Sequence, residues 1–131
     1  MEPKDVTILV VDDVNSIRLQ IKEVLKTFGF HTILLASSGE EAKEMIETRP
    51  IHLILCDWAM LPTSGIELLK YCRESIQHKD MPFILVTASN TQEEVVEAVQ
   101  AGVDDYIVKP LTMGQVQTKV FKVLTRKKVL I

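Results

Sequence analysis

The chain is poor in the features that would place it in several large classes of protein. It holds two cysteines, Cys56 and Cys72, both inside apolar patterns, so we expect buried thiols instead of a disulfide or a metal site. The formal net charge of −3 offers no basic surface for nucleic acid. No signal peptide is recognisable and the longest apolar runs are about as long as a strand, which predicts a soluble cytoplasmic protein without membrane insertion.

The residue patterns of several enzyme classes are missing as well. The sequence shows no Ser/His/Asp or Cys/His arrangement, and His31, His52 and His78 have no ligand-like spacing. We expect these histidines to be structural or exposed. Repeats, linkers and low-complexity stretches are absent. The length predicts one domain over residues 1–131, which buries roughly two-thirds of its unfolded surface.

Short apolar runs alternate with amphipathic segments along the chain. The runs are nearly continuous, as expected of parallel strands covered on both faces. They occupy residues 6–11, 31–36, 51–56, 82–87 and 106–108. Between them, apolar residues recur every three or four positions, as on the core face of a helix. One such set is Ile17, Ile21, Val24 and Phe28.

Helix boundaries are also marked. Residues 38–41, 64–67 and 112–115 read as capping boxes, and residues 90–93 as a close variant. Gly29 and Gly102 can supply left-handed positions at helix ends. The alternation of strand and helix predicts an α/β fold: a doubly wound five-stranded parallel sheet in a three-layer αβα arrangement. We expect the flavodoxin-like strand order 2-1-3-4-5.

Polar residues stand where four of the five predicted strands end. They are Asp12 and Asp13, Asp57, Thr87, and Lys109 with Pro110, after the first, third, fourth and fifth strands. In the order 2-1-3-4-5 these strands are neighbours about 4.8 Å apart, so the acidic pair lies beside Asp57 and Thr87 flanks it. The backbone of Lys109 is two strands, or about 10 Å, from Asp57, and its long side chain can lean toward the carboxylates.

Three carboxylates in this arrangement repel one another. At an effective dielectric of about 20 and a spacing of about 5 Å, each pair costs roughly 3 kcal/mol. Lys109 offsets part of that cost, and a hard divalent cation with oxygen ligands, Mg²⁺, offsets the rest. The alternative is that the acids cap helices in polar loops, which for Asp13 alone is an equally good interpretation.

A carboxylate can act as a nucleophile and form an acyl phosphate. Phosphoryl transfer mainly needs positioning and charge neutralisation, which Mg²⁺, Lys109 and the Thr87 hydroxyl could supply. With Asp12 and Asp13, Asp57, Thr87 and the Lys109-Pro110 pair on five strand–helix units, the chain resembles the receiver domain of two-component response regulators. The resemblance covers essentially the whole chain and is closest to the single-domain chemotaxis type.

The resemblance implies a role for each of these residues. Asp57 is implied to accept a phosphoryl group from a sensor histidine kinase, a phosphotransfer protein or a small phosphodonor. Asp13 and Asp57 are implied to bind Mg²⁺, with Asp12 assisting and the backbone carbonyl of Ala59 as a further ligand. Lys109 is implied to pair with the carboxylate or phosphate. Slow self-dephosphorylation is expected, in place of conventional enzyme turnover.

The resemblance also implies a switch. Thr87 is implied to shift toward the phosphate and Tyr106 to move inward with it, although Tyr106 can also be read as an ordinary amphipathic ring at a sheet edge. Phosphorylation adds charge and strong acceptors, which shifts a pre-existing equilibrium on the face made by residues 90–101, 105–108 and 112–124. A downstream protein, such as a motor switch or another effector, is expected there.

The sequence departs from the family pattern at three places. Ala59 stands where a polar residue is frequent, but the ligand there is main chain, so we expect metal binding to survive. Pro62 comes one position later than in the usual Met-Pro pair, which predicts a reshaped loop beside an intact site. Leu111 replaces a frequent phenylalanine, a packing change.

Three other interpretations fit parts of the pattern. A flavin or nucleotide binder would carry a phosphate cradle after the first strand, where this chain has Asp12 and Asp13. A metal-dependent phosphatase would need a further acid or base near Asp57. A fragment of a DNA-binding regulator could continue from the basic residues 126–128, although such residues at a helix end more often complement the helix dipole.

Overall fold

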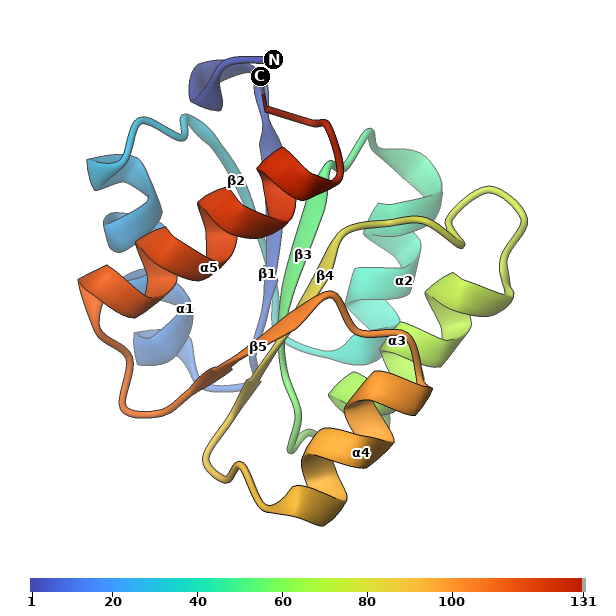
Figure 1. Ribbon diagram of the computed structural model, residues 1–131. Helices are drawn as coiled ribbons and strands as arrows, with labels where there is room; N and C mark the ends of the chain where they lie inside the picture. Colours follow the sequence, from blue (N-terminus) through green and yellow to red (C-terminus); the bar gives the residue numbers. More distant parts are fainter. Residues whose placement is uncertain (131) are drawn as a thin grey trace.

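The computed structural model describes residues 1–130 and contains a five-stranded parallel sheet in the order β2-β1-β3-β4-β5 (Figure 1). The strands are β1 (Thr7–Val11), β2 (Thr32–Ala36), β3 (Leu53–Asp57), β4 (Phe83–Thr87) and β5 (Asp105–Val108). The helices are α1 (Asn15–Thr27), α2 (Gly39–Thr48), α3 (Gly65–Glu74), α4 (Gln92–Gln100) and α5 (Met113–Arg126), after a 3-10 turn at Pro3–Asp5. The predicted fold class and strand order are confirmed. Within residues 1–130, no helix is long and apolar enough to cross a membrane.

Two apolar layers hold the helices to the sheet. Successive side chains of a strand point to opposite faces, so Ile8 and Val10 of β1 pack with α1 and α5, while Leu9 and Val11 pack with α2, α3 and α4. Helices α1 and α5 therefore cover one face and the other three helices cover the second (Figure 1). This double burial explains why the strand sequences are nearly continuous apolar runs.

The edge of the sheet departs from the prediction that all strands are covered on both faces. Strands β3 and β4 are buried along their whole length. In β2, however, Ile33, Leu34 and Leu35 are half-buried and Thr32 is exposed. An edge strand has no neighbour on its outer side, so the flanks of its side chains stay open to solvent.

One of the predicted capping boxes forms in full and a second forms only in part. Ser64 and Glu67 make the reciprocal box at the start of α3. At α2, Ser38 accepts the N–H of Glu41 as expected, but the Glu41 carboxylate accepts the N–H of Ser37 instead of that of Ser38. The second half of the α2 box is therefore one residue away from its predicted place.

The other two helix starts differ more. Helix α4 is capped by Thr91, whose hydroxyl accepts the N–H of Glu94, so the box predicted at residues 90–93 is wrong by one position. Thr112 caps α5 as predicted, but the Gln115 amide turns to β5 and bonds both the N–H and the carbonyl of Val108. Gln115 thereby fixes the end of β5.

Other local predictions are confirmed. Gly29 and Gly102 have φ angles of 95° and 91°, the left-handed geometry expected at the ends of α1 and α4. Cys56 and Cys72 are buried and free. Burial raises the pKa of the Cys56 thiol well above its usual value and that of Cys72 to about 11, which makes both thiols unreactive.

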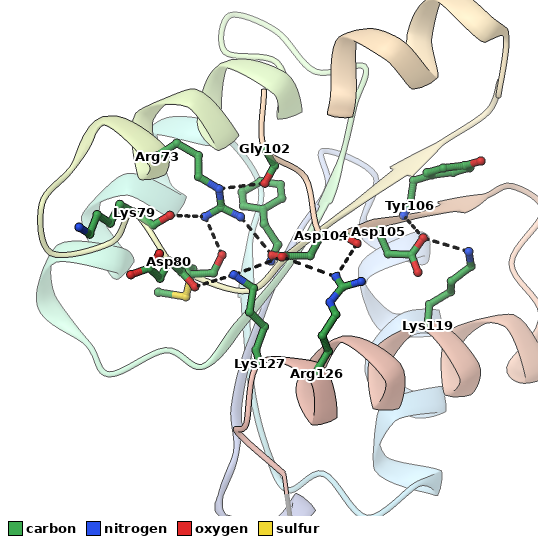
Figure 2. Close-up of polar contacts among 12 residues, drawn as sticks. Arg73, Lys79, Asp80, Gly102, Asp104, Asp105, Tyr106, Lys119, Arg126 and Lys127 are labelled. Atoms are coloured by element: carbon green, nitrogen blue, oxygen red, sulfur yellow. Dashed lines mark hydrogen bonds and ion pairs between the residues drawn. The ribbon is translucent and has the colours of Figure 1, made fainter. Parts of the chain in front are cut away.

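The start of β5 is fixed by a cluster of charges around Asp104 (Figure 2). One oxygen accepts the Phe83 N–H at 2.8 Å and the Arg73 guanidinium at 3.1 Å, and the other lies 3.2 Å from the Lys127 ammonium. Arg126, at the end of α5, adds a longer contact of 3.7 Å. These contacts join α3, β4, β5 and α5 at the amino ends of the strands, and they give the basic end of α5 a structural role.

Candidate functional site

Three carboxylates meet at the carboxyl ends of β1 and β3. Asp12 and Asp13 directly follow β1, and Asp57 is the last residue of β3. The two strands are paired in register, with Val11 opposite Cys56, so Asp12 and Asp57 come side by side. One oxygen atom from each carboxylate lies within 4.8 Å of the other two. The structure therefore brings together the acidic residues that the strand order predicted.

Asp12 is the most constrained of the three. Asp12 is 1% exposed and Asp57 is 6% exposed, whereas Asp13 faces solvent. Oδ1 of Asp12 accepts the Val14 N–H at 2.9 Å, but its buried Oδ2 has no hydrogen-bond donor within residues 1–130. Burial raises the pKa of Asp12, and the charges of Asp57 and Asp13 raise it further, against the opposing effects of the Val14 N–H and Lys109.

This donor set fits a small divalent cation. A buried carboxylate oxygen without a donor is costly, and a metal ion removes that cost. Hard oxygen ligands are those that Mg²⁺ prefers. The position of Val14 at the N-cap of α1 also shows that the alternative role of Asp13 as a helix cap is wrong. The cluster of Asp12, Asp13 and Asp57 could thus hold a metal ion.

Lys109 reaches the carboxylates from the end of β5, two strands away. Its Nζ lies 3.0 Å from Oδ1 of Asp57 and 3.7 Å from Oδ2 of Asp12. The backbone N–H of Lys109 donates to the carbonyl of Thr87 at 2.7 Å, which holds the start of the side chain against β4. The inward lean expected of this side chain is present.

Thr87 ends β4 beside Asp57, but its hydroxyl is engaged elsewhere. Oγ1 donates to the carbonyl of Ser89 at 2.8 Å and accepts the N–H of Ser89 at 3.1 Å. Thr87 is 6% exposed and lines the same hollow as Asp57. Its hydroxyl must therefore release Ser89 before it can bond to a group held at Asp57.

The backbone around Asp57 is held by close contacts. The Cys56 thiol donates to the Asp57 carbonyl at 3.2 Å, and the Gly65 N–H donates to the Trp58 carbonyl at 2.9 Å. A Cβ atom on Gly65 would lie 2.3 Å from the Asp57 carbonyl oxygen. A residue without a side chain is thus needed where α3 begins.

The loop between Asp57 and Gly65 docks on α2. Met60 is 3% exposed and Thr63 is 7% exposed, whereas Pro62 faces solvent. The Thr63 hydroxyl donates to the Glu40 carboxylate, which lowers the pKa of Glu40, and its methyl group packs against Gly39. The shifted proline is accommodated on the outside of this loop, and the exposed Ala59 remains at the rim of the site.

Tyr106 lies on β5, half-buried, beside Lys119 of α5 (Figure 2). The Lys119 ammonium is 5.2 Å from the centre of the Tyr106 ring and 3.0 Å from Oδ1 of Asp105. A narrow hollow of about 10 Å³ has both Tyr106 and Thr87 in its lining. The two residues that the resemblance assigns to a switch thus border one small space.

Asp13 and Asp57 open into a hollow of about 480 Å³. Its lining includes the predicted residues Asp13, Asp57, Ala59, Thr87 and Lys109, together with Val14, Trp58, Ala88, Ser89, Glu94 and Glu97. The sequence reasoning missed Glu94 and Glu97 of α4. Their spacing of three residues puts them on one helix face, but nothing in that spacing shows which face turns toward Asp57.

Comparison with known proteins gives consistent results. The protein-family model of the response regulator receiver domain matches residues 8–121 of this chain. The chain is 36% identical over 123 residues to the chemotaxis protein CheY-3 of Vibrio cholerae, covering 94% of this chain and 95% of that protein. It is 37% identical over 118 residues to a chemotaxis protein CheY homolog of Campylobacter jejuni, covering 89% and 91%.

Solved structures agree with the sequence relatives. The structure of the chemotaxis response regulator CheY4 of Vibrio cholerae superposes with a TM-score of 0.85 at 27% identity, covering 91% of this chain and 98% of that one. A CheY-like receiver domain protein from Methanospirillum hungatei gives a TM-score of 0.85 at 28% identity, covering 95% and 97%. The similarity extends over nearly the whole length of each protein.

Proposed function

The chain belongs to the response regulator receiver domains of CheY type, which act in two-component phosphorelays, and from this premise we propose that Asp57 is its phosphoryl acceptor. The observation that carries the proposal is the position of the Asp57 carboxylate. It lies between the Lys109 ammonium, at 3.0 Å, and the Asp12 and Asp13 carboxylates, at the floor of an open hollow. A nucleophilic oxygen, a neutralising cation and a metal-binding set therefore meet at one point.

Each residue has a defined part in the transfer. An oxygen of Asp57 attacks phosphorus and becomes the bridging oxygen of an acyl phosphate, while the bond from phosphorus to the donor breaks and the donor departs with its electron pair. Lys109 pairs with a phosphoryl oxygen, and Thr87 donates its hydroxyl to another after releasing Ser89. Asp12, Asp13, Asp57 and the Ala59 carbonyl would hold Mg²⁺, which when bound supplies positive charge that offsets the charges of the carboxylates and the phosphoryl group.

The same movement is proposed to transmit the signal. When Thr87 turns toward the phosphoryl group, the small hollow that it shares with Tyr106 enlarges. The ring then has room to move inward and away from Lys119. This would change the surface of α4, β5 and α5 and favour a partner that prefers the changed state.

The proposed partners follow from the family. A sensor histidine kinase or phosphotransfer protein would supply the phosphoryl group, and a downstream protein, such as a motor switch or another effector, would bind the changed surface. We further propose that residues 1–131 act as one receiver domain in the cytoplasm, and that hydrolysis of the acyl phosphate is slow self-dephosphorylation. No nucleic-acid contact is proposed for this domain.

The test uses the fluorescence of Trp58, the single tryptophan of the chain, which lines the hollow next to Asp57. We expect the emission to change when Mg²⁺ is added and to change again with beryllofluoride, a mimic of the phosphoryl group. Asp57→Asn should lose the beryllofluoride response, because the mimic needs the carboxylate oxygen. A wild-type protein that responds to neither ligand would contradict the proposal.

A further inference from the structure

Two glutamates at the rim of the hollow have no part in the roles described above. Glu94 and Glu97 lie three residues apart on α4 and line the hollow together with Asp57 and Lys109. Glu94 is half-buried and Glu97 is exposed. Neither carboxylate forms an ion pair with another of residues 1–130. Both charges are therefore available to act on whatever enters the hollow.

The geometry of phosphoryl transfer places the leaving group near these charges. The attacking and leaving atoms lie roughly in line on opposite sides of phosphorus. Asp57 attacks from the buried floor, since it is 6% exposed. The leaving group must then face the open side of the hollow, where Glu94 and Glu97 stand.

We propose that Glu94 and Glu97 select the class of phosphodonor, favouring phosphoramidates over acyl phosphates. The proposal rests on the phosphoacceptor role of Asp57. A phosphoramidate carries a positive charge on its protonated nitrogen, which two nearby carboxylates attract. In an acyl phosphate, the acyl oxygen next to phosphorus becomes part of a departing carboxylate. The two glutamates repel the negative charge of that carboxylate. A phosphohistidine of a protein donor shares the phosphorus–nitrogen bond and belongs to the favoured class.

The two reactions differ in what leaves. In both, an Asp57 oxygen forms a bond to phosphorus. With a phosphoramidate, the phosphorus–nitrogen bond breaks, and the protonated nitrogen keeps the electron pair and departs as a neutral amine. With an acyl phosphate, the phosphorus–oxygen bond breaks and a carboxylate departs with the electron pair and a negative charge. In both reactions the leaving group gains one negative charge, but the phosphoramidate nitrogen goes from positive to neutral whereas the acyl oxygen goes from neutral to negative. The glutamates therefore favour the phosphoramidate while its nitrogen keeps positive charge, and they oppose the carboxylate charge that develops in the second reaction.

The expected effect is modest and depends on salt. A unit charge about 8 Å from the leaving group in water changes a rate roughly twofold. Two such charges should change the preference between the donors about fivefold at low ionic strength. Because exposed charges are screened over about 10 Å at 0.1 M salt, the preference should shrink as salt is added.

The test compares phosphorylation rates with phosphoramidate and with acetyl phosphate at saturating Mg²⁺, measured by intact-protein mass spectrometry. The variants are the double substitution Glu94→Gln with Glu97→Gln, and Glu93→Gln as a matched control. Glu93 is on the first turn of the same helix and does not line the hollow. We expect the double variant to shift the rate ratio about fivefold toward acetyl phosphate, with a weaker salt dependence, and the control to keep the wild-type ratio.

Metal loading is followed separately through Trp58 fluorescence, so that a change in Mg²⁺ affinity is not mistaken for a change in donor preference. Equal rate changes for both donors, or an equal shift of the ratio in Glu93→Gln, would overturn the assignment of Glu94 and Glu97 while leaving Asp57 as the acceptor. A wild-type protein that neither donor phosphorylates would contradict the proposed function itself, and donor selection with it.

Discussion

The Nζ atom of Lys109 lies 3.0 Å from Oδ1 of Asp57, across a separation of 52 residues in the sequence. The same ammonium is 3.7 Å from the buried Oδ2 of Asp12. One cation thus serves two carboxylates that would otherwise repel each other. A metal ion bound to these carboxylates would share them with Lys109, so metal affinity and lysine charge should oppose each other.

Lys109→Met should therefore separate metal binding from phosphoryl transfer. We expect the variant to bind Mg²⁺ roughly tenfold more tightly, because a nearby positive charge has been removed, and to be phosphorylated more slowly. Added Mg²⁺ should also raise its Tm by more than it raises that of the wild type. Trp58 fluorescence titration and thermal unfolding measure these effects, with the exposed Lys122→Met as the control. Unchanged or weaker Mg²⁺ binding in Lys109→Met would contradict this account.

Gly65→Ala should disturb the backbone that holds Asp57. Because the new Cβ would lie 2.3 Å from the Asp57 carbonyl oxygen, we expect a loss of about 2 to 3 kcal/mol in the free energy of unfolding and weaker Mg²⁺ binding. Gly114→Ala is the matched control. Outside its chain neighbours and the nearby backbone of α5, a Cβ on Gly114 meets no atom of residues 1–130 within 4 Å, so a gain of about 0.5 kcal/mol is expected. Urea denaturation measures the free energy of unfolding of both variants. Equal effects of the two substitutions would count against the packing argument.

His52 should make stability depend on pH. Its Nδ1 accepts the Thr7 N–H at 2.9 Å, and burial, followed by the charge of the N-terminus, lowers its pKa. The unfolded chain therefore binds a proton more readily than the folded protein, so the free energy of unfolding should fall as the pH drops below about 6.5, the unperturbed value.

The matched variant for this prediction is His52→Asn, whose side-chain oxygen can accept the same hydrogen bond without titrating. Urea denaturation at a series of pH values between neutral and mildly acidic conditions measures the difference. The variant should lose less stability than the wild type over this range. Parallel curves for the two proteins would show that His52 contributes nothing to the pH dependence.

Much of the site could be predicted because strand order alone places strand ends. A buried parallel strand has a simple sequence pattern, and its last residue lies at a known edge of the sheet. The strand order is therefore enough to predict that Asp12, Asp13 and Asp57 lie close together and that the Lys109 side chain points toward them. The positions of side chains on strands follow from a period of two, which leaves little freedom.

The features that sequence reasoning missed depend on loops and on helix rotation. The sequence pattern predicts the start of α4 one residue early, because Asn90 and Thr91 are both good caps and the choice between them depends on the preceding loop. The first residue of α4 also sets the rotation of the helix, and with it the helix face, carrying Glu94 and Glu97, that points toward the hollow. The engagement of the Thr87 hydroxyl by Ser89 is a local backbone geometry that residue types alone do not specify.

The most direct test of the central claim is the site of phosphorylation. Wild-type protein and Asp57→Asn are each treated with Mg²⁺ and phosphoramidate, and intact mass measurement is followed by peptide mapping. The account predicts one phosphoryl group per wild-type chain, on the peptide that contains Asp57, and no stable label on Asp57→Asn. Label retained by the variant at the wild-type stoichiometry would contradict the assignment of Asp57 as the acceptor.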